Sequence, residues 1–113
     1  MKRVLKDYIY DIVDSLKEVG EFTEGMNLTE FIKDKRTINA VIRSLEVMGE
    51  ASKKVPEGTR EKYQHIPWKR IAGMRDKLIH EYHGVDLEIV WTVVKEELPP
   101  LKPFFENMLR DIE

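Results

Sequence analysis

Apolar side chains recur every three to four residues along nearly the whole chain, and this helical spacing constrains the fold more than any other feature. The pattern is clearest over residues 3–20, where one helix face carries Leu5, Tyr8, Ile9, Ile12, Leu16 and Val19. No segment shows the alternation of apolar and polar residues that marks a half-buried strand. The sequence therefore predicts an all-α protein.

Capping residues indicate where the second helix begins and ends. Asn27 and Glu30 form the pattern of a capping box, so we expect a second helix to begin there and to run to about Lys54. The apolar stripe of this helix is wide enough to pack against two neighbouring helices. A short helical turn over residues 59–64 follows.

Prolines and one aspartate set the ends of the remaining helices. Pro67 suits the first position of a third helix, which we expect to extend through Tyr82. Asp86 is a good N-cap for a fourth helix, and the two prolines at 99–100 must kink or split that helix. Four main helices with short connections predict an up-and-down four-helix bundle with a kinked or split last helix.

Length and composition limit the class of protein. A chain of 113 residues is the size of one domain, so we expect a single helical domain over residues 1–113. One small domain would have difficulty covering all the apolar faces, which makes a homodimer the first expectation. No apolar run approaches the roughly 18 residues of a membrane span, and the first residues lack the apolar stretch of a signal peptide. Without cysteine there is no disulfide or thiolate chemistry, and we expect a cytoplasmic protein.

Charge is distributed unevenly along the chain. The net charge is −2, yet residues 53–80 carry eight basic and three acidic side chains, whereas residues 81–113 carry three basic and eight acidic ones. This balance excludes a generic coat for nucleic acid, which needs a strongly basic surface. It leaves room for a local basic cleft that admits one phosphate backbone. The alternative is that oppositely charged helices simply face each other.

Arg75 interrupts the apolar stripe of the third helix. That stripe consists of Trp68, Ile71, Ala72, Leu78, Ile79 and Tyr82. Position 75 lies at its centre, and an arginine facing a core is costly unless a partner receives it. One interpretation is a structural strut, with Arg75 paired to Glu46 or Glu50 one turn apart on the second helix. The other is a functional site, because violations of local rules tend to occur there.

Two more residues of this helix bear on chemistry. His80 lies about 140° around an ideal helix from Arg75, so the two side chains flank a groove or meet across a dimer interface. Asp76, four residues before His80, is placed to orient the imidazole or to raise its pKa. The plain alternatives are a solvent-facing His80 and a core Tyr82 with its hydroxyl at the rim. A metal site built from His80 and His83 with Asp76 or Asp86 is a weak alternative, since paired carboxylate motifs are missing.

The segment Arg75-Asp76-Lys77-Leu78-Ile79-His80-Glu81-Tyr82 resembles the Arg, four residues, His, any residue, Tyr motif of the HepT proteins, a branch of the HEPN superfamily. The flanking segments resemble that family too, at residues 49–51, 66–74, 84–86 and 90–91, and the similarity extends over about residues 38–109. No motif position departs from the pattern.

The resemblance implies a fold, an activity and partners. HepT proteins are helical homodimers that act as metal-independent, RNA-cleaving toxins, and transfer RNA is one type of target. Their antitoxin is a small nucleotidyltransferase of the MntA type, which transfers AMP onto the motif tyrosine, here Tyr82. The resemblance thus implies catalytic roles for Arg75 and His80, supporting roles for Tyr82 and Asp76, and no cofactor. The alternatives are a non-catalytic dimer that binds a nucleotidyltransferase or a nucleotide, and a purely structural dimer.

Overall fold

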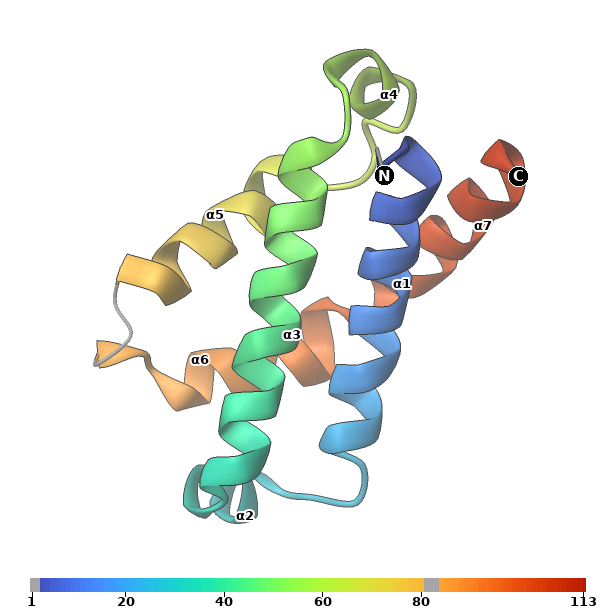
Figure 1. Cartoon of the computed structure of the whole chain (residues 1–113). Helices are drawn as coiled ribbons and strands as arrows, with labels where there is room; N and C mark the ends of the chain where they lie inside the picture. The colour runs from blue at the N-terminus through green and yellow to red at the C-terminus, as the bar shows by residue number, and fades with distance from the viewer. Residues whose placement is uncertain (1–2, 81–83) are drawn as a thin grey trace.

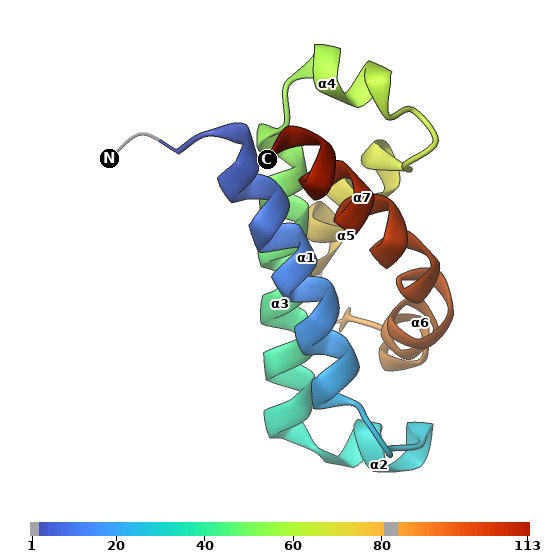
Figure 2. The ribbon, with the colours of Figure 1, turned by 90° about the vertical axis from the view of Figure 1, so that its right-hand side faces the viewer.

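The computed structural model describes residues 3–80 and 84–113, and these residues are helical almost throughout. The long helices α1 (Leu5–Phe22) and α3 (Lys35–Lys54) lie side by side and antiparallel (Figure 1). Helix α5 (Trp68–His80) packs on the other side of α3. The last segment contains α6 (Leu87–Thr92) and α7 (Lys102–Ile112), and α7 returns along α1 (Figure 2). The predicted all-helical bundle with a split last helix is confirmed.

Helix α1 forms for the reason that its periodicity indicates. Its core-facing residues are buried, namely Ile9, Ile12, Val13, Leu16 and Val19. The Asp7 carboxylate accepts a hydrogen bond from the Val4 amide at 2.9 Å, which closes the first turn. The helix begins and ends two residues later than the predicted range of residues 3–20.

The predicted second helix is wrong in one respect, because it is two helices. Asn27 caps α2 (Leu28–Lys33) as expected, with its side chain accepting from the Glu30 amide at 2.8 Å. At Asp34 the backbone becomes extended, and its carboxylate accepts from the Thr37 amide at 3.1 Å to start α3 afresh. The break turns Phe31 into the core, where its ring centroid lies 5.1 Å from that of Trp91.

The third helix begins one residue later than predicted, at Trp68, after the short helix α4 (Glu57–Lys62). Pro67 stands just before it and accepts from the Ile71 amide through its carbonyl at 3.1 Å. The expected third-helix residue Tyr82 lies outside the described residues.

The last helix splits where prolines require it. Asp86 caps α6 as predicted, accepting from the Glu88 and Ile89 amides. A wide π turn over Val93–Glu97 follows, in which the Leu98 amide donates to the Val93 carbonyl at 2.9 Å. The 3₁₀ turn Pro99–Leu101 then leads into α7. Across residues 3–80 and 84–113, none of the helices combines the length and apolar character needed to cross a bilayer.

Candidate functional site

The site is built where Gly49 of α3 lies directly against Arg75 of α5. A Cβ atom added to Gly49 would lie 2.9 Å from Cγ and 3.2 Å from Cα of Arg75, and closer still to its Cβ. These separations are below the ordinary carbon–carbon contact of about 3.5–4.0 Å. Only a glycine therefore allows the backbone of α3 to sit against the base of the Arg75 side chain.

The Arg75 guanidinium is held at both ends by carboxylates from different helices. Its Nη2 lies 3.1 Å from Oε2 of Glu50 on α3. Its Nη1 lies 3.2 Å from Oδ1 of Asp76, the next residue on α5. The Arg75 side chain is 27% exposed, so it is partly buried and still reachable from solvent. Of the two partners that the sequence left open, Glu50 rather than Glu46 is the one observed.

Lys53 completes this group and was missed by the sequence analysis. Its Nζ lies 2.6 Å from the same Oδ1 atom of Asp76. The Lys53 ammonium, and secondarily the Arg75 guanidinium, hold the pKa of the Asp76 carboxyl below its usual range. The spacing of Lys53 could have indicated this role, because Glu50 and Lys53 lie three residues apart and so share a face of α3. We call Glu50, Lys53, Arg75 and Asp76 the Arg75 cluster.

The other motif residues are only partly placed. His80 is the last residue of α5, and its side chain lies outside what is described, as does Tyr82 altogether. The expected contact between Asp76 and His80, and the groove shared by Arg75 and His80, thus remain predictions. The metal alternative also depends on His80 and His83. Among the described residues, no group of three or more His, Asp or Glu side chains is arranged to hold a metal ion.

A pocket of about 440 Å³ opens beside the Arg75 cluster, between α1, α3 and α5. Besides Arg75 and Glu50, its wall contains side chains of both signs, namely Arg3, Asp11, Arg43, Glu46 and Lys54, together with Tyr8. Arg3 is already paired with Asp11 at 2.8 Å, and its guanidinium lies 5.0 Å from the centre of the Tyr8 ring. The pocket is large enough for a nucleotide-sized group and gives it access to Arg75.

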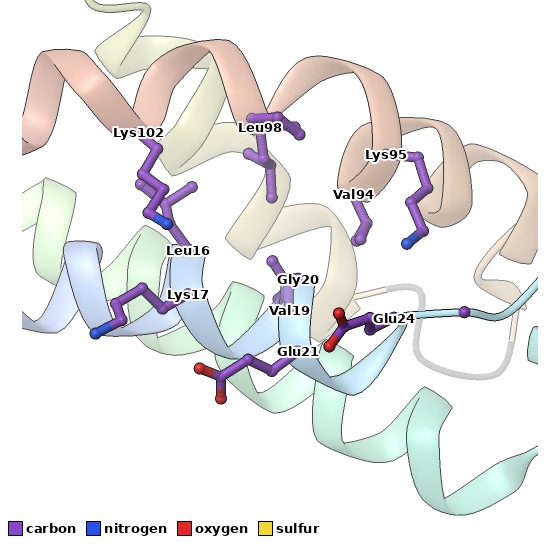
Figure 3. Close-up of a pocket in the computed structure, with 12 residues that line it drawn as sticks. Leu16, Lys17, Val19, Gly20, Glu21, Glu24, Val94, Lys95, Leu98 and Lys102 are labelled. Atoms are coloured by element: carbon purple, nitrogen blue, oxygen red, sulfur yellow. The ribbon is translucent and has the colours of Figure 1, made fainter.

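A second pocket, of about 460 Å³, lies between the end of α1 and residues 94–102 (Figure 3). Lys17 and Lys102 lie toward one end of it, and Lys95 and Glu24 toward the other. Lys95 has a structural task, because its Nζ donates to the Thr23 carbonyl at 3.0 Å and lies 5.1 Å from the centre of the Trp91 ring. The pocket beside Arg75 is the candidate site, since that one contains a motif residue.

Comparison with known proteins gives the family. The model of the family described as ribonuclease HepT-like matches residues 12–108. The chain belongs to this family. No solved structure gives a significant match.

Several relatives are similar to this chain over nearly all of its length. A candidate RNase of Methanocaldococcus jannaschii is 51% identical over 112 residues, which cover 99% of this chain and 93% of the relative. A candidate ribonuclease HepT of Thermococcus cleftensis is 47% identical over 108 residues, covering 96% of this chain and 98% of the relative. A larger M. jannaschii protein, named as a gamma-glutamylcyclotransferase and candidate RNase, is 41% identical over 113 residues, which are 51% of its length.

Proposed function

We propose that this HepT-like protein is the RNA-cleaving toxin of a HepT/MntA-type toxin–antitoxin system, and that it acts as a metal-independent endoribonuclease. The observation that carries the proposal is the partly exposed Arg75 guanidinium, oriented by Glu50 and Asp76 at the edge of a nucleotide-sized pocket. Membership of the ribonuclease HepT-like family, and the RNase names of its relatives, support the same activity. The resemblance to HepT proteins implies transfer RNA as a substrate.

The proposed chemistry uses the 2′-hydroxyl of the RNA as nucleophile. Its oxygen attacks the adjacent phosphorus, the bond from phosphorus to the 5′ oxygen breaks, and a cyclic phosphate remains. One group must accept the proton of the 2′-hydroxyl and one must protonate the departing 5′ oxygen. His80 suits this proton transfer because an imidazole has an ordinary pKa of about 6.5. Arg75 suits the phosphate, because its fork of N–H donors stabilises the charge that develops on the oxygens.

The direct test is RNA cleavage by purified Arg75→Ala and His80→Ala variants. We expect each to lose at least about 100-fold in rate, since each removes an interaction made in the transition state. Arg36→Ala is the matched control, because it removes the same charge from an exposed position in the first turn of α3. If either motif variant cuts RNA as fast as the parent, the proposal fails.

The toxin–antitoxin part of the proposal concerns Tyr82. AMP on its hydroxyl would add negative charge and bulk beside the phosphate-binding arginine, and so repel and exclude RNA. The test is the intact mass of the protein after co-expression with a cognate MntA-type nucleotidyltransferase. We expect additions of the mass of AMP that disappear in Tyr82→Phe. Additions that persist in that variant would contradict the role of Tyr82.

A second candidate function is a non-catalytic homodimer that presents the site to a nucleotidyltransferase or a nucleotide. One observation favours it, namely that the Arg75 cluster contains two cations and two carboxylates and so has no net charge at neutral pH. This candidate predicts binding of the partner without loss of RNA, even at high protein concentration. The homodimer itself is common to both proposals, and the half-exposed Ile89 beside an apolar groove between α5 and α6 supports it.

A further inference from the structure

The two carboxylates that hold Arg75 differ in how firmly they are themselves held. Asp76 Oδ1 accepts from Lys53 at 2.6 Å as well as from Arg75, so Asp76 is tied to α3 independently of the arginine. Glu50 has Arg75 as its ion-pair partner among the described residues, and its side chain is 48% exposed. Asp76 is nearly as exposed, at 42%, so the second contact with Lys53 is what distinguishes the two carboxylates. An exposed ion pair without such support contributes little stability. Glu50 is therefore the partner that Arg75 can release.

The group that replaces Glu50 must satisfy the same donors. A carboxylate and a phosphodiester each carry a single negative charge and present two oxygens to a guanidinium. Exchanging one for the other gives Nη2 a partner of the same charge and shape, while the displaced Glu50 carboxylate turns to solvent and Nη1 stays bound to Asp76. The guanidinium then keeps its orientation throughout the exchange.

We propose that Glu50 is a positioning residue that holds Nη2 of Arg75 in the free protein and competes with the RNA phosphate for it. This inference rests on the proposed function, in that the competing ligand is RNA. Glu50 sets the affinity of the site, whereas Asp76 sets its geometry. Gly49 makes the competition possible, because the close approach that it allows brings the next residue of α3 within reach of Arg75.

The experiment measures binding of a single-stranded 2′-O-methyl RNA oligonucleotide, which keeps the phosphates but lacks the nucleophile. We expect Glu50→Gln to bind this probe about two- to fivefold more tightly at low salt, since an exposed ion pair competes only weakly. The slope of log K against log salt should steepen by up to about 0.7, because in the parent the displaced Glu50 carboxylate takes up a cation that offsets the one released from the phosphate. With cleavable RNA, KM should fall in the same proportion.

Glu46→Gln is the matched control. Glu46 lies one turn earlier on α3 and lines the same pocket, yet among the described residues it forms no ion pair with Arg75. The two variants change the net charge equally, so a general electrostatic effect would tighten binding in both. The gain of Glu50→Gln should also vanish when Arg75→Ala is added. Glu50→Asp, which shortens the reach of the carboxylate but keeps its charge, should give an intermediate gain.

The outcomes separate this inference from the proposed function. If the parent cleaves RNA but Glu50→Gln binds the probe no more tightly than Glu46→Gln, the competition is wrong and the ribonuclease proposal stands. If Glu50→Gln gains affinity through Arg75 but Arg75→Ala does not alter RNA cleavage, the competition stands and the ribonuclease proposal fails. A purely structural Glu50 would lower the melting temperature and leave the salt slope unchanged, which would also overturn the inference.

Discussion

Replacing Gly49 with alanine tests the contact on which the site is built. The new methyl group would lie 2.9 Å from Cγ and 3.2 Å from Cα of Arg75, so α5 must move away from α3 at this point. Overpacking costs about 1–3 kcal/mol, and we take the upper half of that range because the clash is with atoms close to the backbone. Alanine in place of glycine inside a helix recovers about 1 kcal/mol. The net destabilisation is about 1–2 kcal/mol, which lowers the melting temperature by about 4–8 °C in a domain of this size.

The same variant has a functional consequence that stability alone does not explain. Moving Arg75 by about 1 Å costs on the order of 100-fold in catalysis, so RNA cleavage should fall by about that factor at temperatures where the protein is still folded. Gly73→Ala is the control, because Gly73 is an exposed glycine within α5 whose added Cβ would meet nothing within 4 Å. It should raise the melting temperature. If Gly49→Ala stabilises the protein as Gly73→Ala does, the close contact of α3 with α5 is wrong.

Two further predictions concern the cap of α3 and the carboxyl group of Asp76. Asp34→Ala removes the side chain that caps α3, and it should cost about 1 kcal/mol in a denaturant melt; an unchanged midpoint would show that α2 and α3 can merge. Asp76→Asn tests the depressed pKa of the Asp76 carboxyl, which Lys53 and Arg75 cause. Such a group stabilises the fold above its unfolded pKa of about 4, and the contribution is lost as the pH falls through the lower folded pKa. Parent and variant should therefore differ in stability at pH 7 and converge in strong acid, and a gap that persists in acid would contradict the assignment.

The helices could be predicted from sequence because burial of one face is a local, periodic property. The division of the expected second helix at Asp34 could not be predicted, because aspartate is tolerated inside a helix as well as favoured at its start. The division accompanies a contact between Phe31 and Trp91, which are far apart in the chain. Their ring centroids lie 5.1 Å apart. The proline break was predictable, whereas the π turn before it was not. That turn is consistent with Pro99, whose ring conflicts with regular helical geometry in the residues that precede it.

In the site, too, the features that depend on neighbouring residues in the sequence could be predicted, whereas contacts between helices could not. The misplaced Arg75 could be recognised from the apolar stripe alone, and so could the need for an acidic partner on the neighbouring helix. Whether Glu46 or Glu50 pairs with Arg75 depends on where α5 crosses α3, which the sequence does not give directly. In the structure Gly49 lies against Arg75, and this contact brings Glu50 within reach. The glycine directly before Glu50 was the one feature of the sequence that could have indicated this crossing point. Under the proposed competition the strut and the functional site are no longer alternatives: the ion pair satisfies a partly buried arginine in the free protein, and its exposed carboxylate is the group that a phosphate would replace.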